Sequence, residues 1–118
     1  MKLPMAMELQ IETRAGGKSG QRVMRMVGKL GLETVPMFLD SMRAQTDPVV
    51  ILDFHDVSYI DSAGVGSLVQ TLAAFRKAQR RLALTGVNER VQKVLEITRV
   101  QALLPSYATV ADAEQQLV

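Results

Sequence analysis

Residues that could carry out chemistry are concentrated in one short run, VSYIDSAGVG, which spans residues 57–66. It places Ser62 directly after Asp61, and the single histidine of the chain, His55, lies upstream. A serine, a histidine and an acid such as Asp53 could form a hydrolase triad, but the run lacks the G-x-S-x-G turn that exposes such a nucleophile. Acids near strand ends could also bind a metal ion, although three of them are weak evidence for one. We therefore predict neither a hydrolase nor a metal site.

Other enzyme classes are excluded by motifs that the sequence lacks. There is no G-x-x-x-x-G-K-[ST] motif, so the chain has no P-loop for nucleotide phosphates. The GVGS run at residues 64–67 has too few glycines for a dinucleotide-binding fingerprint, and it falls within a helical pattern. With no cysteine and one histidine, disulfides, thiolate catalysis and a multi-histidine metal centre are absent as well. Most enzyme classes are therefore disfavoured, and we expect no cofactor.

The junction of Asp61 and Ser62 has two interpretations that do not exclude each other. Serine is among the best N-cap residues, because its oxygen accepts hydrogen bonds from amides of the first helical turn. Gly64 and Gly66, however, each cost a helix about 1 kcal/mol relative to alanine. They leave the helix start bare enough for another protein or a nucleotide phosphate to approach. A phosphate on Ser62 would be favoured by the helix dipole and opposed by Asp61, so the sequence predicts a helix cap that can also act as a phosphorylation switch.

The elements around this junction can be predicted from the spacing of apolar residues. The β-branched, apolar run at residues 48–54 is typical of a strand buried on both faces, and residues 56–61 are predicted to form a connector. From Ser62 onward, apolar residues recur at helical intervals. Segment 14–20 is rich in breakers and indicates a mobile, basic hairpin tip. The remaining predictions are hairpin strands at 7–13 and 21–30, a helix at 33–44, a strand at 81–86, a helix at 88–98 capped by Asn88, a short extended segment within 102–109 and a last helix capped by Thr109.

Three strand–helix alternations after the hairpin predict an α/β fold in which the later strands are largely parallel. A length of 118 residues suits one domain, and 47% hydrophobic residues suffice for its core. The net charge of +2 does not indicate nucleic-acid binding. The N-terminal residues lack the apolar region of a signal peptide, and no run approaches the roughly 20 apolar residues of a membrane span. We therefore expect a cytoplasmic protein without direct contact to membranes or nucleic acids.

Four motifs follow the pattern of one known family. They are Asp53 at the end of the apolar strand, V-x-[FY]-I-D-S followed by [SA]-G-[LV]-G at residues 57–66, N-x-x-V-x-x-x-L-x-[IL]-T at residues 88–98 and G-x-L at residues 28–30. In these motifs the chain resembles the STAS domain family, and specifically its bacterial anti-sigma factor antagonists. The likeness covers about residues 5–117, so we expect residues 1–118 to form a single STAS domain.

The resemblance implies a mixed sheet of four to five strands, opened by the hairpin, with about four helices. It also implies a partner switch, in which the unphosphorylated protein binds an anti-sigma factor that is itself a GHKL-type serine kinase, and thereby frees the client of that kinase. Phosphorylation of Ser62 ends the binding, and a PP2C-type phosphatase resets the serine. The chain would be a substrate and a ligand, present as a monomer or weak dimer. The implied partner surface comprises Ser58, Tyr59, Asp61, Ser62, Ala63, Gly64, Val65 and Gly66.

The chain departs from the family pattern at two places. Many members carry an acid directly after G-x-L, where this chain has Gly31, and T-G-[LI] is replaced by Thr98-Arg99-Val100. The client need not be a sigma factor, because similar switches govern secretion and motility. Two other functions stay open: a STAS scaffold within a larger signalling complex, and an accessory subunit of an ABC transport ATPase.

Overall fold

Strands and helices alternate along residues 9–117, the part of the chain that the computed structural model describes. In chain order they are β1 (Leu9–Ala15), β2 (Gln21–Leu30), α1 (Val35–Arg43), β3 (Val49–Ile60), α2 (Ser62–Lys77), β4 (Arg81–Thr85), α3 (Glu89–Ile97), β5 (Ser106–Tyr107) and α4 (Val110–Gln116). The prediction that the first strand begins at Met7 concerns residues outside the described part.

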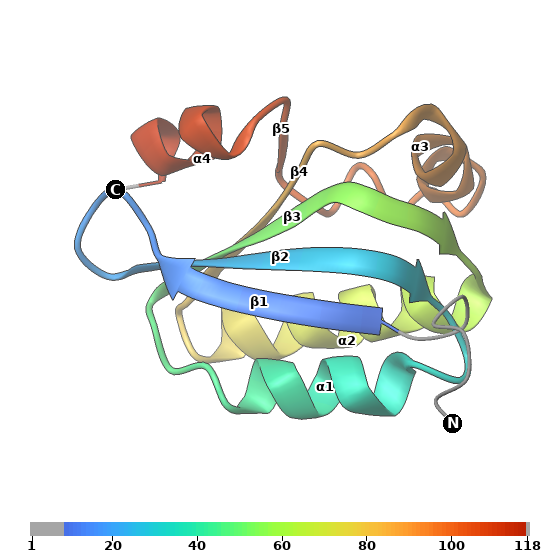
Figure 1. Ribbon diagram of the computed structural model, residues 1–118, viewed down its shortest axis with the longest axis horizontal. Coiled ribbons are helices and arrows are strands. Elements are labelled where there is room, and N and C mark those ends of the chain that lie inside the picture. Colours follow the sequence, from blue (N-terminus) through green and yellow to red (C-terminus); the bar gives the residue numbers. More distant parts are fainter. Residues whose placement is uncertain (1–8, 118) are drawn as a thin grey trace, which may run out of the picture.

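The five strands form one mixed sheet in the order β1-β2-β3-β4-β5 (Figure 1). β1 and β2 are antiparallel, and each later pair is parallel. Neighbouring parallel strands need a crossover connection, and α1, α2 and α3 provide these connections. The predicted α/β fold, with an N-terminal hairpin, a mixed sheet and four helices among the described residues, is confirmed.

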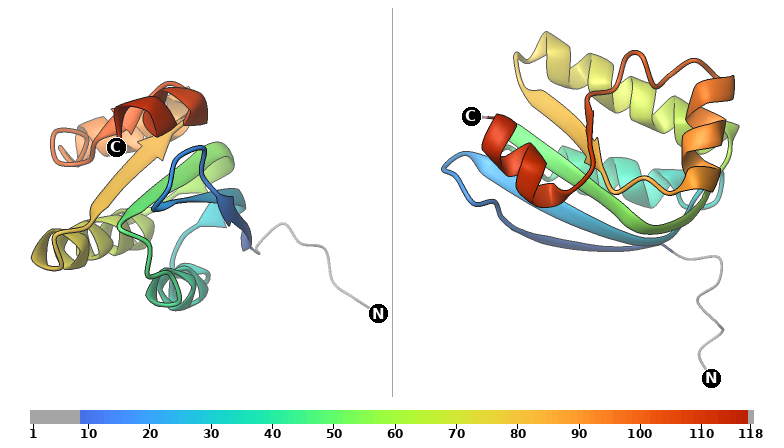
Figure 2. Two further views of the ribbon diagram at one scale, coloured as in Figure 1. Left: turned by 90° about the vertical axis from the view of Figure 1, so that its left-hand side faces the viewer. Right: turned by 90° about the horizontal axis from the view of Figure 1, so that it is seen from above.

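The two faces of the sheet are covered by different helices. α1 and α2 lie against one face and α4 against the other (Figures 1 and 2). The larger core joins the sheet to α1, α2 and α3 through Met24, Met26, Leu52, Phe54, Phe38, Leu68 and Leu95. On the opposite face, Ala113 and Leu117 pack against Val23, Ile51 and Ala83. Because alternate residues of a strand point to opposite faces, β2 and β3 contribute to both cores, which is why neither strand shows a clear polar face.

β3 is longer than predicted and takes the place of the expected connector at residues 56–61. Residues Val27–Leu30 of β2 pair with residues between Asp56 and Ile60, and the ladder contains two register shifts. Val57 and Ile60 are buried there. The connector prediction is therefore wrong, because pairing with the hairpin strand and burial of two apolar side chains outweigh the weak local pattern.

The predicted helix starts are largely confirmed. Pro36 lies in the first turn of α1, where a helix does not need its N–H. Asn88 caps α3 by accepting a hydrogen bond from the Val91 amide at 2.8 Å, and Thr109 caps α4 by accepting one from the Asp112 amide at 3.1 Å. None of the helices within residues 9–117 is long and apolar enough to cross a membrane.

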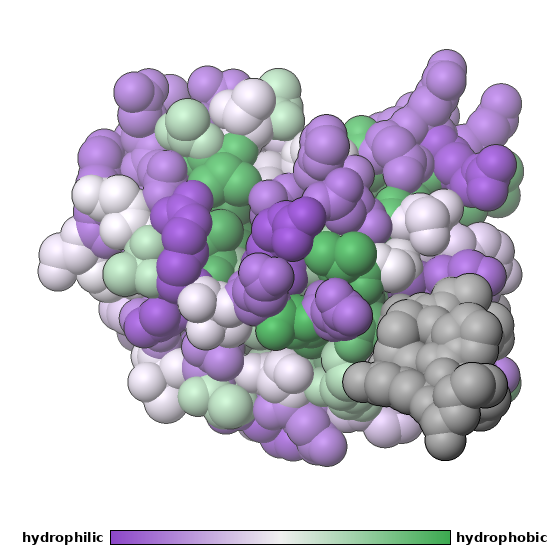
Figure 3. All heavy atoms as spheres, viewed as in Figure 1, coloured by the Kyte–Doolittle hydropathy of each residue, from purple (hydrophilic) through white to green (hydrophobic). Residues whose placement is uncertain are grey.

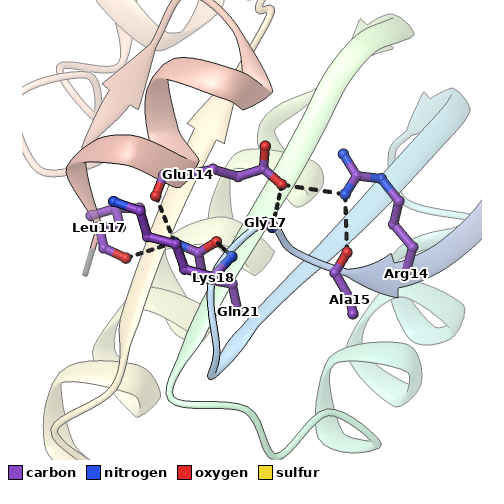
Figure 4. A network of polar contacts seen from close by, with 7 residues as sticks. All are labelled: Arg14, Ala15, Gly17, Lys18, Gln21, Glu114 and Leu117. Carbon is purple, nitrogen blue, oxygen red and sulfur yellow. Dashed lines mark hydrogen bonds and ion pairs between the residues drawn. The ribbon is translucent and has the colours of Figure 1, made fainter.

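The tip of the hairpin is attached to α4 (Figure 4). The buried Gln21 donates from Nε2 to the carbonyl oxygens of Glu114 and Leu117, at 2.8 Å in each case. The Glu114 carboxylate accepts a hydrogen bond from the Gly17 amide at 2.7 Å and another from Arg14 at 3.3 Å. The basic tip, which the sequence predicted to be mobile, is thus anchored by hydrogen bonds to α4 and to Leu117 directly after it.

Candidate functional site

Asp61, and not Ser62, caps α2. The backbone of Asp61 is extended, and its Oδ1 accepts a hydrogen bond from the Gly64 amide at 2.9 Å. Ser62 is the first residue of the helix. The predicted serine cap is therefore wrong by one position, because aspartate and serine are equally good N-caps and local sequence does not decide between neighbours.

The Ser62 side chain is exposed at the start of α2. Within residues 9–117 its hydroxyl takes part in no hydrogen bond. The cap of α2 therefore does not depend on the Ser62 hydroxyl. Because Asp61 provides the cap, Ser62 can be modified without removing it.

The second oxygen of Asp61 connects α2 to the loop that precedes α1. Asp61 Oδ2 accepts a hydrogen bond from the Leu32 amide at 3.1 Å. A Cβ atom at Gly31 would lie only 2.7 Å from the same oxygen, so a side chain there would push the carboxylate away. Gly31 thus makes room for an aspartate that links two elements, and an acid in its place would also set two like charges side by side.

The two glycines at the start of α2 lie in different surroundings. Gly64 is buried, and a Cβ atom there would collide with the carbonyl oxygen of Leu30 and with the Ile60 side chain. Its small size is needed for the close packing of α2 on the end of β2. Gly66 is exposed and has open space where its Cβ atom would be. The interpretation that both glycines keep the helix start bare therefore applies to Gly66 and not to Gly64.

A hollow of about 310 Å³ lies beside this junction. It is lined by Lys29, Gly31, Leu32, Glu33, Thr34, Tyr59 and Asp61. Leu32 is 75% exposed and Tyr59 is 43% exposed, and the Lys29 ammonium lies 5.9 Å from the centre of the Tyr59 ring. Large exposed apolar side chains that gather beside polar groups are typical of a surface that binds another protein.

The predicted site residues occupy the end of β3 and the first turns of α2, but they differ in accessibility. Ser58, Tyr59, Ser62 and Gly66 are exposed, Asp61 and Ala63 are half-buried, and Gly64 and Val65 are buried. Val65 packs in the larger core, so its side chain supports the helix and offers no surface. The sequence did not identify Leu32 and Lys29, although the G-x-L motif indicated the segment that carries them.

The acids and the histidine upstream of Ser62 contact one another and Arg25. Asp53 accepts a hydrogen bond from the His55 amide at 3.0 Å, and Asp56 accepts one from Arg25 at 2.6 Å. The Arg25 hydrogen bond holds the pKa of Asp56 below its ordinary value. None of these contacts includes Ser62, and the described residues contain no group of three histidine or acidic side chains that could hold a metal ion.

Comparison with known proteins identifies the family. The model of the STAS domain matches residues 10–113. The anti-sigma-B factor antagonist of Staphylococcus aureus is 33% identical over 101 residues, which represent 83% of this chain and 92% of that protein. The chain belongs to the STAS domain family.

Solved structures share the fold at lower sequence identity. The Bacillus cell fate determinant SpoIIAA in its phosphorylated form has a TM-score of 0.70 and 18% identity, and the match covers 92% of this chain and 100% of that one. The murine anion transporter Slc26a9 has a TM-score of 0.69 and 20% identity, and the match covers 85% of this chain and 18% of that one. The same fold therefore makes up the whole of one protein and a small part of the other.

Proposed function

We propose that this protein is an anti-sigma factor antagonist whose binding is controlled by phosphorylation of Ser62. With Ser62 unmodified it binds an anti-sigma factor, which then releases its sigma factor or another client, and with Ser62 phosphorylated it does not. The observation that carries the proposal is an exposed serine at the start of a helix whose cap is supplied by Asp61. The likeness to a Staphylococcus protein named as an antagonist of anti-sigma-B factor supports the same role.

A phosphate on Ser62 would change the docking surface without unfolding the domain. The first amides of α2 and the helix dipole favour an anion at this position, and the cap bond between Asp61 and Gly64 can persist. The phosphate would add a charge of about −2 beside Asp61, whose carboxylate is held by two amides and cannot turn away without losing them. A partner that fits a neutral hydroxyl would then meet adjacent anions, and its binding would weaken.

In both steps of this cycle the chain is a substrate and not an enzyme. The Ser62 oxygen attacks the γ-phosphorus of ATP held with Mg²⁺ by a GHKL-type serine kinase, ADP leaves, and the hydroxyl proton passes to a base of the kinase or to water. A PP2C-type phosphatase transfers the phosphoryl group to water and restores the hydroxyl. Because amides occupy both oxygens of Asp61, we assign this residue to positioning Ser62 and not to removing its proton.

The first experiment identifies the partner in the natural host of this protein. Wild type, Ser62→Ala and Ser62→Asp are immobilised and used to capture proteins from the host lysate. We expect wild type and Ser62→Ala to retain a GHKL-type serine kinase, and Ser62→Asp to bind it about tenfold more weakly, which corresponds to about 1.4 kcal/mol. Recovery of an ABC ATPase or a large signalling complex in place of the kinase would support the transport or scaffold function.

The second experiment locates the modification with the purified kinase and ATP. Mass spectrometry should find one phosphate on Ser62 of the wild type and none on Ser62→Ala. Ser58→Ala is the matched control, because Ser58 is another exposed serine on the same surface, and it should be phosphorylated like the wild type. Phosphate at another position, or equal kinase affinity of Ser62→Asp and wild type, would refute the proposal.

A further inference from the structure

The outer edge of β1 is a long strand edge that no described residue covers. β1 and β5 are the two edges of the sheet, and β1 has seven residues while β5 has two. β1 lies at the front in Figure 1 and at the margin of the sheet in Figure 2. Its residues from Glu12 to Ala15 are all exposed. The unpaired backbone groups of such an edge can bind a strand from another chain.

The register of the hairpin shows which backbone groups of β1 are free. Gly16 donates its amide to the Gln21 carbonyl at 2.8 Å, so the backbone groups of Gly16 point toward β2. Hydrogen-bonded and non-bonded pairs alternate along an antiparallel ladder. The amides and carbonyls of Ile11, Thr13 and Ala15 therefore point away from β2. The Ala15 carbonyl accepts a hydrogen bond from the Arg14 side chain at 3.0 Å, which agrees with this orientation.

The charges along the edge favour one register for pairing with an identical strand. Glu12 and Arg14 lie on the same face of β1, with Thr13 between them. In an antiparallel pair centred on Thr13, each Glu12 lies opposite Arg14 of the second copy, in the non-bonded positions where side chains are closest. Registers centred on Glu12 or on Arg14 would place like charges opposite each other.

We propose that β1 pairs antiparallel with β1 of a second copy, centred on Thr13. The five-stranded sheets of the two copies would then join into one continuous sheet across the dimer. The free groups of Ile11, Thr13 and Ala15 would supply about six hydrogen bonds between the copies. Arg14 would exchange its contacts with the Ala15 carbonyl and with Glu114 for a contact with Glu12 of the other copy. Glu12 would share its carboxylate between this arginine and Arg25 of its own chain, which lies 3.6 Å away. The Arg14 side chain is 58% exposed in its ion pair with Glu114, and Glu114 would keep its hydrogen bond from the Gly17 amide. The exchange is therefore not a large barrier.

The contact is small, so the dimer is weak and most populated at high protein concentration. It uses the hydrogen-bonding pattern of the sheet and charges of opposite sign, and it needs no apolar surface. Figure 3 shows hydrophilic side chains, with smaller hydrophobic areas between them, on the face that is seen in Figure 1. The inference goes beyond the proposed function and stands or fails independently of it.

The register is tested by a disulfide cross-link, because the chain contains no cysteine. In Thr13→Cys, the two new cysteines lie opposite each other at about 5.5 Å between Cα atoms, which a disulfide can span. Gln10→Cys is the matched control: Gln10 is also exposed on β1, but the two copies of residue 10 would be about 20 Å apart in this register. We expect mild oxidation to cross-link Thr13→Cys at least about tenfold faster than Gln10→Cys.

The charge pairing is tested in the Thr13→Cys background. Glu12→Arg places arginine opposite arginine, and Arg14→Glu places glutamate opposite glutamate, so each variant alone should cross-link about tenfold more slowly. A mixture of the two variants restores opposite charges at both positions and should form cross-linked heterodimers at the original rate. The double swap Glu12→Arg with Arg14→Glu should also recover, with the net charge of the wild type.

Each outcome decides for or against the proposal. Preferential cross-linking at residue 13 together with recovery in the mixture establishes the register and the charge pairing. Equal cross-linking at residues 10 and 13 would show that the copies meet only by random collision, and failure of the mixture to recover would show that Glu12 and Arg14 do not face each other. Either result overturns the proposal, as does a Thr13→Cys chain that forms no cross-link.

Discussion

At the scale of single residues, the site depends on how Asp61 uses its two oxygens. One oxygen accepts from the Gly64 amide and caps α2, and the other accepts from the Leu32 amide and holds the loop before α1. The neighbouring Ser62 is left exposed and unbonded among the described residues. A single carboxylate therefore provides the rigidity of the helix start, and the serine beside it is free to be modified.

The two glycines of the α2 start provide a prediction about single residues. Gly64→Ala should destabilise the fold by about 1–3 kcal/mol, because the new methyl group meets the Leu30 carbonyl and this overpacking exceeds the gain in helix propensity. Gly66→Ala should be neutral or stabilise by up to about 1 kcal/mol, because its surroundings are open. Urea unfolding of both variants measures the difference. Equal destabilisation of the two would contradict the separate causes that we assign to these glycines.

At the scale of elements, the hairpin and α4 hold each other in place. Gln21 is buried and bonds two carbonyls at the end of α4, while Glu114 of that helix bonds the hairpin tip at Gly17 (Figure 4). α4 has only seven residues, and a helix this short is not stable alone in water. It therefore depends on these bonds and on packing against the sheet.

Removing the Gln21 side chain should loosen α4. Gln21→Ala leaves two carbonyls without their donor, and we expect a loss of about 2 kcal/mol in the free energy of unfolding. Relative to the wild type, Gln21→Ala should also speed up hydrogen exchange of the α4 amides more than that of the α2 amides. Hydrogen exchange with mass spectrometry can measure this difference. Gln92→Ala is the matched control, because within residues 9–117 the Gln92 side chain donates only to the exposed Glu96 carboxylate. It should change stability by less than about 0.5 kcal/mol. Equal effects of the two variants would contradict this role of Gln21.

The sequence was informative about elements where the determinants are local. The caps at Asn88 and Thr109 were correctly predicted, because each depends on residues within one helical turn. The extension of β3 and the anchoring of the hairpin tip were not predicted, because each depends on partners far away in the chain. The hollow beside Leu32 was not predicted for the same reason. The G-x-L motif at residues 28–30 lies next to it, but the hydrogen bond from Leu32 to Asp61 joins residues 29 positions apart.

At the scale of the whole molecule, Ser62 is well separated along the sheet from Thr13, the centre of the proposed β1 contact. Ser62 follows the end of β3, where Ile60 pairs with Leu30 of β2. Thr13, the centre of the proposed dimer contact, pairs with Met24, which is six residues earlier on β2. Six residues of extended strand span about 20 Å. The residues that form the β1 contact are therefore separate from the residues of the Ser62 surface.

This separation predicts that the two surfaces act independently, because effects at sites more than about 7–10 Å apart with no shared contacts are usually additive. Adding Ser62→Asp to the Thr13→Cys chain should change the rate of cross-linking by less than about twofold. Conversely, Glu12→Arg, which weakens the edge contact, should change the affinity for the captured kinase by less than about twofold, as measured by surface plasmon resonance at low protein concentration. If either change exceeds about tenfold, or 1.4 kcal/mol, the surfaces are coupled, and phosphorylation of Ser62 would then control self-association as well as partner binding.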